Sequence, residues 1–169
     1  GLMHVAVARA RGCRRIVVSE PAEHRRQSAL ERGADRVADP ATDDLAAVIA
    51  EESQEGRGAE VVITAAPAAS AQRQALELAG PGGRINFFGG LPRDASEVAL
   101  DTNLIHYKEL LVTGTSANTT ADCQEALDLV LAGAVDTPGM VSARFALDEI
   151  QPALQAAASG EALKVVVEP

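Results

Sequence analysis

At 169 residues, the chain is long enough for one ordinary domain with a small addition. Hydrophobic residues make up 47% of the sequence and aromatic residues only 2%, so Ala, Val, Leu and Ile must build the core. A net charge of -9 and few base-stacking side chains argue against a nucleic-acid partner.

Apolar runs and turn residues alternate along the first two thirds of the sequence. We expect helices where small and apolar residues recur at helical spacing, and strands where apolar runs are short and continuous. In chain order, the predicted elements are a helix over 1–11, a strand over 16–19, a helix from Pro21 to residue 32, a strand over 36–38, a helix from 43–44 onward, a strand over 60–64, a helix over 68–79, a tight turn over 80–83, a strand over 84–88, a polar connection and a strand over 110–113.

This alternation predicts an α/β fold, a Rossmann-like doubly wound parallel sheet. The alternation weakens after Ser116, where we expect helices over 122–132 and 148–158 and a closing strand over 163–167. We therefore divide the chain into residues 1–115, a partial nucleotide-binding domain, and residues 116–169, a C-terminal helix and strand segment.

The sequence shows neither a signal peptide nor an apolar run long enough to span a membrane, so we expect a cytoplasmic protein without membrane contact. Cys13 and Cys123 lie far apart and have no metal-ligand spacing. The three histidines, at positions 4, 24 and 106, do not converge on a zinc-like pattern either. We expect the two cysteines to be buried or incidental thiols and the three histidines to be structural or exposed, and we assign the chain no metal ligand.

The strand over 16–19 leads into Glu20, nineteen positions after Gly1. An acidic residue at this strand end can accept hydrogen bonds from the ribose hydroxyls of NAD, and it would repel the extra phosphate of NADP. Arg25 follows one helical turn later and can reach the same side. The alternatives are a solvated cap for Glu20 and a solvated helix face for Arg25.

Three further strand ends carry small residues, at 64–67, 89–90 and 113–115. Ligands of open α/β sheets bind across the carboxyl ends of the strands, and small residues there let a flat ring approach the backbone. Taken with Glu20, these ends predict a dinucleotide site.

Several motifs follow one another in a familiar order. They are Gly1 to Ala6 (GLMHVA), Val17 to Pro21 (VVSEP), Gly33-Ala34-Asp35 followed by Asp39-Pro40, Gly80 to Arg84 (GPGGR), Phe87 to Gly90 (FFGG), Asp101 to Glu109 (DTNLIHYKE) and Gly160 to Val166 (GEALKVV). With them, the whole chain resembles the C-terminal, NAD-binding half of the zinc-dependent medium-chain alcohol dehydrogenases. The resemblance is to their polyol branch, which contains sorbitol, galactitol-phosphate and threonine dehydrogenases.

The resemblance implies that the catalytic zinc and the proton relay belong to an N-terminal GroES-like domain outside these residues, so no catalytic residue is assigned here. Gly1 matches the last glycine of the G-x-G-x-x-G turn, which implies that the first strand of the Rossmann sheet also lies outside the sequence. The resemblance also implies a homodimer or homotetramer whose subunits pair through the edge strand 110–114. The implied cofactor-binding residues are Gly1, Leu2, Ser19, Glu20, Pro21, Arg25, Ala65, Ala66, Phe88, Gly89, Leu91, Thr113, Gly114, Thr115 and Lys164.

The expected parent activity is hydride transfer between a secondary alcohol or polyol and NAD, with zinc as the Lewis acid. These residues alone are expected to be inactive. The turn Ala65-Ala66-Pro67 departs from the glycine-bearing turn usual at its position. Two alternatives remain open: a non-catalytic nucleotide-binding or interaction module, and a zinc-free quinone reductase relative, for which a basic residue would be expected in place of Glu20.

Overall fold

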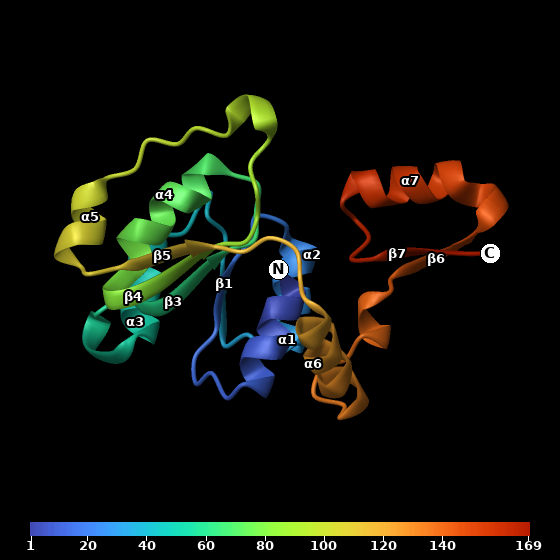
Figure 1. The fold of residues 1–169 in the computed structure, drawn as a ribbon, viewed down its shortest axis with the longest axis horizontal. Helices are drawn as coiled ribbons and strands as arrows, with labels where there is room; N and C mark the ends of the chain where they lie inside the picture. Colours follow the sequence, from blue (N-terminus) through green and yellow to red (C-terminus); the bar gives the residue numbers. More distant parts are fainter. The chain divides into compact units, whose positions relative to one another are not determined.

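The chain folds into two compact units, Gly1–Thr119 and Thr120–Pro169, in the computed structural model. The structure describes residues 1–169, with the exception of the Pro138 side chain. Every strand pairing in the described residues is parallel, and helices separate the paired strands along the chain (Figure 1). The predicted α/β fold with parallel sheets is confirmed.

The first unit alternates strands and helices. Its strands are β1 (Val17–Ser19), β2 (Arg36–Ala38), β3 (Ala59–Thr64), β4 (Ala79–Phe87) and β5 (Leu111–Gly114). Its helices are α1 (Leu2–Ala10), α2 (Glu23–Glu31), α3 (Leu45–Glu52), α4 (Ala69–Leu78) and α5 (Thr102–Tyr107), with short 3-10 turns at Gln54–Gly56 and Arg93–Ala95.

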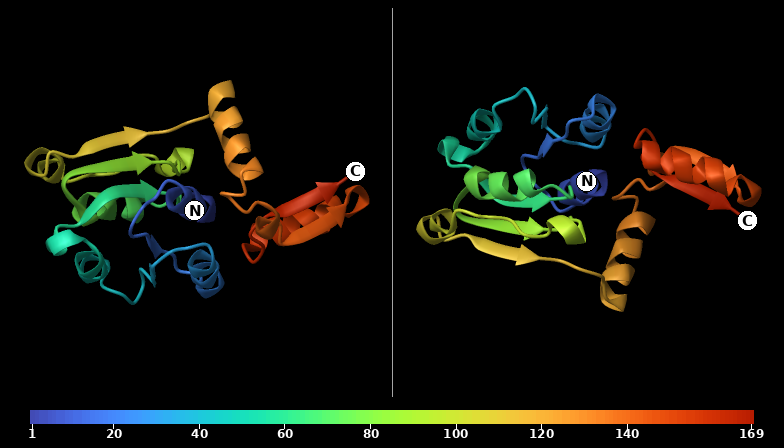
Figure 2. Two further views of the ribbon diagram at one scale, coloured as in Figure 1. Left: turned by 90° about the horizontal axis from the view of Figure 1, so that it is seen from below. Right: turned by 90° about the horizontal axis from the view of Figure 1, so that it is seen from above.

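The strands of the first unit form two separate ladders. Strand β1 pairs with β2, and β3, β4 and β5 lie side by side in that order (Figure 2). Within the described residues no ladder joins β1 to β3. Helix α3 connects the two groups through its buried Leu45 and Val48, which pack with Val17 of β1 and Leu78 of α4. The carboxyl ends of the parallel strands are the positions at which the sequence predicts a site.

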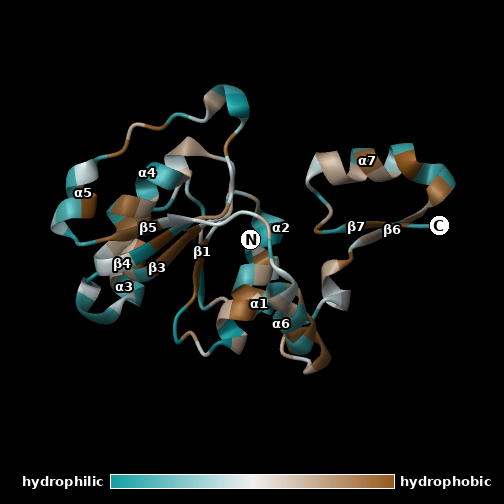
Figure 3. Cartoon of the chain, in the orientation of Figure 1, coloured by the Kyte–Doolittle hydropathy of each residue, from teal (hydrophilic) through white to brown (hydrophobic). Residues whose placement is uncertain are grey.

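The core of the three-stranded sheet is aliphatic. Leu76 of α4 and Ile85 of β4 are its largest fully buried side chains, and Ala75, Ala79 and Leu110 complete the buried cluster. Hydrophobic colour runs along β3, whereas α4 carries hydrophilic residues as well (Figure 3). Helix α4 buries one face against this sheet because Gln72, Ala75 and Leu76 recur at helical spacing.

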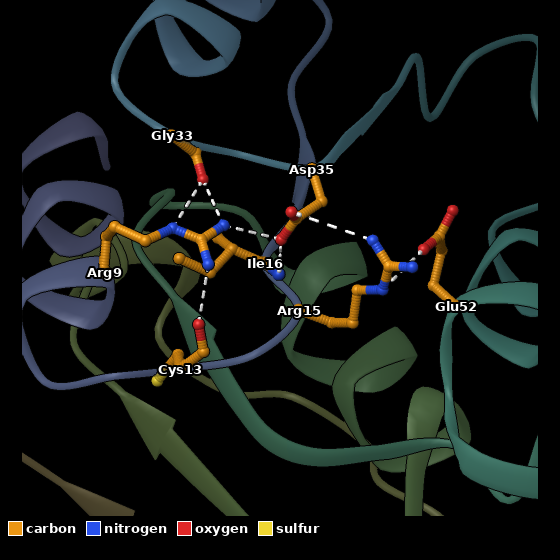
Figure 4. Close-up of polar contacts among 7 residues, drawn as sticks. All are labelled: Arg9, Cys13, Arg15, Ile16, Gly33, Asp35 and Glu52. Carbon is orange, nitrogen blue, oxygen red and sulfur yellow. Dashed lines mark hydrogen bonds and ion pairs between the residues drawn. The ribbon is translucent and has the colours of Figure 1, made fainter.

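A charged network fixes the opposite, amino-terminal ends of β1 and β2 (Figure 4). The Arg9 guanidinium at the end of α1 donates to the carbonyl oxygens of Gly33 and Cys13, and it also pairs with Asp35 at 2.7 Å. The same Asp35 carboxylate accepts a 2.7 Å hydrogen bond from the backbone N–H of Ile16. This network therefore joins α1, the end of α2 and the starts of both strands.

The second unit contains a parallel strand pair and two helices. Its elements are α6 (Thr120–Leu131), β6 (Ala143–Ala146), α7 (Ile150–Ser159) and β7 (Val165–Glu168), with 3-10 turns at Pro138–Met140 and Leu147–Glu149. Helix α7 packs on both strands and buries Ala153. It ends at Gly160, whose φ of 75° is the left-handed conformation that favours glycine at a helix C-terminus.

Several predicted boundaries were wrong, for identifiable reasons. Pro21 lies before α2, because Ala22 is the N-cap and the helix begins at Glu23. The predicted turn over 80–83 is part of β4, which begins at Ala79. Gly80 lies so close to the loop before β3 that a Cβ on it would be 2.5 Å from the Arg57 carbonyl oxygen.

Two elements had not been predicted at all. The connection before β5 contains α5, whose N-cap Asp101 accepts a hydrogen bond from the Asn103 N–H, a capping signal visible in the sequence. Strand β6 has only four residues, Ala143–Ala146, whose side chains alternate between half-buried and exposed. Such a short alternation is a weak sequence signal.

Candidate functional site

Glu20 follows directly on β1 and continues its ladder, because its N–H donates to the Ala38 carbonyl oxygen at 3.0 Å. The Oε1 atom of its carboxylate accepts a 3.0 Å hydrogen bond from the Ala22 N–H. The side chain is half-buried. Glu20 is therefore a carboxylate in a defined orientation at the end of a strand, as the sequence predicts for a group that accepts hydrogen bonds from hydroxyls.

The N-terminus of α1 lies near this carboxylate. Gly1 is the N-cap of α1 and contributes no side chain that could cover the first helical turn. The Gly1 nitrogen lies within electrostatic range of both Arg25 and the Glu20 carboxylate. Gly1, Glu20 and Arg25 are thus electrostatic neighbours. A helix N-terminus beside them presents N–H groups and a partial positive charge, which favour an anion such as a pyrophosphate.

The ends of β3 and β4 approach each other closely. The Gly89 N–H donates to the Thr64 carbonyl oxygen at 2.7 Å, and a Cβ on Gly89 would lie 2.9 Å from the Ala66 carbonyl oxygen. Only glycine allows this approach without displacement of the backbone. Ala65 and Ala66 themselves are exposed, so their small side chains leave this strand end open.

Side chains at the end of β5 form a hydrogen-bonded row with β4. Asn86 donates to Thr113 Oγ1 at 3.2 Å and accepts from Thr115 Oγ1 at 2.6 Å, and Thr113 Oγ1 donates to the Ile85 carbonyl oxygen. Sequence reasoning identified both threonines but missed Asn86. The strand register places Asn86 opposite Thr113, and that register is not visible in the sequence.

His4 was also missed as a neighbour of the site. Its ring meets the Phe88 ring edge-on, with centroids 4.5 Å apart, so α1 contacts the end of β4. Burial lowers the pKa of His4. A lowered pKa leaves the imidazole neutral at neutral pH. In the described part of the chain its buried Nδ1 has no hydrogen-bond partner.

A cavity of about 490 Å³ adjoins these groups. It lies over the face of the three-stranded sheet that carries Ile63, Asn86 and Thr113, and its lining continues to His4, Phe88 and Thr115. The polar side chains of Asn86, Thr113 and Thr115 therefore lie toward the strand-end side of a face whose other residues are apolar except for Arg84. That combination is typical of small-molecule sites.

The structure does not unite all the candidate residues. Gly1, Leu2, Glu20 and Arg25 lie together at one group of strand ends, whereas residues 64–66, 88–89 and 113–115 lie at the other. Ser19 is exposed at the end of β1, Pro21 is exposed before α2, and Leu91 follows Gly89-Gly90. Lys164 belongs to the second unit, where its carbonyl oxygen accepts from the Ser142 N–H.

The described residues contain no group of three or more His, Cys, Asp and Glu side chains that could hold a metal ion. They do not fit a catalytic zinc, which needs three converging protein ligands. Among the same residues, no helix is long and apolar enough to cross a membrane.

Comparison with known proteins gives a consistent result. Residues 1–132 match a family described as zinc-binding dehydrogenase. L-threonine 3-dehydrogenase of Thermococcus kodakarensis is 33% identical over the whole chain, and the enzyme of Caldanaerobacter subterraneus is 32% identical. The chain covers 48% of each of these relatives, so it spans about half their length.

Solved structures agree in fold. A zinc-binding dehydrogenase from Sinorhizobium meliloti 1021, bound to NADP, matches 99% of this chain and 49% of its own, with 32% identity and a TM-score of 0.89. An alcohol dehydrogenase from Thermotoga maritima matches with a TM-score of 0.91 at 24% identity, over 47% of its length. The chain therefore belongs to the zinc-binding dehydrogenase family and corresponds to its cofactor-binding part.

Proposed function

We propose that residues 1–169 bind NAD as the cofactor-binding part of a dehydrogenase that acts on a secondary alcohol or polyol. The observation that carries this proposal is the Glu20 carboxylate, oriented at the end of β1 beside the N-terminus of α1. L-threonine is itself a secondary alcohol, so the threonine dehydrogenase relatives fit this substrate class. Bound NAD accepts or returns the hydride at its nicotinamide ring.

Each group of strand ends has a distinct part in the proposed site. Glu20 accepts hydrogen bonds from the adenosine ribose, Arg25 supports the same side, and Ser19 and Pro21 flank the ribose. Gly1 and Leu2 hold the pyrophosphate at the start of α1. The path toward the nicotinamide is lined by Ala65, Ala66, Phe88, Gly89, Leu91, Thr113, Gly114 and Thr115.

The remaining parts of the proposal concern the wider protein. Residues 1–115 form the cofactor domain, while residues 116–169 run toward a catalytic domain, and Lys164 reaches the pyrophosphate from there. In this proposal, the catalytic domain of the dehydrogenase holds the zinc that the family description names. The cytoplasmic localisation stays a prediction.

We also propose assembly into a homodimer or homotetramer through the edge strand 110–114. Strand β5 pairs with β4, and in the described residues no strand covers its other edge. An open apolar strand edge favours continuation of the sheet into a second copy around a two-fold axis.

Calorimetric titration of the full-length protein with NAD and with NADP tests the cofactor proposal. Glu20→Ala should weaken NAD binding by at least about tenfold, because a hydrogen bond to a charged group contributes about 1.5–3 kcal/mol. Glu23→Ala is the matched control, since it removes an exposed carboxylate from the first turn of α2. Absence of saturable NAD binding, or equal NAD affinity in wild type and Glu20→Ala, would overturn the proposal.

A further inference from the structure

The residue next to Arg25 holds the backbone of Glu20 in place. The Nη1 atom of Arg26 donates to the Glu20 carbonyl oxygen at 2.7 Å and to the Pro21 carbonyl oxygen at 2.6 Å. The same nitrogen meets Asp39 Oδ2 at 3.0 Å. One guanidinium nitrogen of α2 thus joins the end of β1 to the residue that follows β2.

Asp39 is itself fixed. Its Oδ1 atom accepts from the Ala41 N–H at 2.9 Å, and its own N–H donates to Asp43 Oδ2 at 2.8 Å. The side chains of Arg26 and Asp39 are only 19% and 23% exposed. Charge-assisted hydrogen bonds between partly covered groups hold their geometry better than exposed ion pairs do.

Glu20 has two constraints as a result. Arg26 holds its carbonyl oxygen, while the Ala22 N–H holds its carboxylate. A released Glu20-Pro21 segment could turn away from the site, and the carboxylate would then neither accept from a ribose nor repel a phosphate at its 2′ position. The preference between NAD and NADP should therefore depend on Arg26, although its guanidinium is engaged with the protein backbone.

We propose that Arg26, anchored by Asp39, is a positioning residue that sets the preference for NAD over NADP by fixing Glu20. This inference rests on the proposed role of Glu20 in ribose binding. It assigns Arg26 a different task from Arg25, which lies near Gly1 and Glu20 and was the basic residue that the sequence pointed to.

The test measures the dissociation constants of both nucleotides for the full-length protein and for Arg26→Met. The ratio of the NADP constant to the NAD constant should fall about tenfold, because a weakened Glu20 loses both its attraction for the ribose and its repulsion of the phosphate. Two other results overturn the inference. A rising ratio would mean that Arg26 acts only as a positive charge, and an unchanged ratio would mean that it only stabilises the fold.

Further variants keep the result interpretable. Arg26→Lys should restore part of the ratio, because an ammonium group has three hydrogens for the three acceptors but sits on a shorter side chain. Asp39→Asn should lower the ratio less than Arg26→Met does, and it serves if Arg26→Met fails to fold. An unchanged ratio in Asp39→Asn would contradict the anchoring role.

Arg32→Met is the matched control. Arg32 belongs to the end of α2 and is similarly covered, with 16% side-chain exposure, and it donates to the Ser28 carbonyl oxygen far from Glu20. Its ratio should equal that of the wild type. If the wild type binds no NAD or Glu20→Ala has no effect, the proposed function fails; if both behave as expected and Arg26→Met leaves the ratio unchanged, only the role of Arg26 fails.

Discussion

The two strand groups of the first unit are stabilised differently. The ladder of β1 and β2 is joined to α1 and α2 by guanidinium groups, Arg9 and Arg26, that donate to carbonyl oxygens and to aspartates. The sheet of β3, β4 and β5 encloses a fully buried aliphatic cluster around Leu76 and Ile85. Arg26 therefore fixes the proposed ribose end of the first group, which also has a small apolar cluster of Val5, Ile16, Ala29 and Ala34, whereas the second group depends on aliphatic packing around Leu76 and Ile85.

The largest effect should come from a cavity in the second group. Ile85→Ala removes most of a side chain with 0% exposure and should lower the free energy of unfolding by about 2–5 kcal/mol. Urea unfolding followed by circular dichroism measures this loss. Val61→Ala is the control on the neighbouring strand, because Val61 is 59% exposed and should change stability by about 0.5 kcal/mol or less. Equal losses in the two variants would contradict an apolar core centred on Ile85.

Lys108 makes charged hydrogen bonds within the group of β3, β4 and β5, so it tests whether that group depends on apolar packing alone. Its Nζ donates to the carbonyl oxygens of Leu76, Glu77 and Ala79 at 2.8–3.1 Å, where α4 ends. Lys108→Met should cost about 1–3 kcal/mol, because these carbonyls lose a charged donor at a helix C-terminus. The same unfolding assay applies, with Arg73→Met, an exposed change on α4, as the control. A loss no larger than that of the control would refute the capping role.

The smallest effect concerns pH and the first group. The Ile16 N–H and the Arg9 guanidinium lower the pKa of Asp35. A lowered native pKa stabilises the fold fully above the unfolded-state pKa of about 3.9, and this contribution disappears as pH falls through the native pKa. The carboxylate is partly exposed, so solvent screens much of the gain.

Urea unfolding between pH 7 and pH 3 checks this expectation. Asp35→Asn should be less stable than the wild type at pH 7, and the difference should shrink toward pH 3. A constant difference across that range would show that ionisation of Asp35 contributes nothing.

Local patterns were sufficient to predict most of the first unit. Strand β2 was predicted with its observed bounds, and α3 begins after Asp44, whose carboxylate accepts from the N–H groups of Ala46 and Ala47. Glu20 was identified because the strand, the acidic residue and the following turn are adjacent in the chain. The proposed roles of the candidate site residues stay predictions.

What the sequence could not provide depends on contacts between distant residues. Arg26 and Arg25 are equivalent in the sequence, and only the path of the chain at Asp39 distinguishes them. Asn86 became visible through its register with Thr113, and His4 through its contact with Phe88. Polar partners of this kind leave no periodic signal.

The short sequence separation between paired strands has a consequence for local unfolding of the chain. β1 and β2 are joined through a single helix, and so are β6 and β7, so each pair forms contacts without closing a long loop. Such segments are natural cooperative units in amide hydrogen exchange. Amides of β6 and β7, which share their own ladder with α7, should therefore exchange independently of those in β3, β4 and β5.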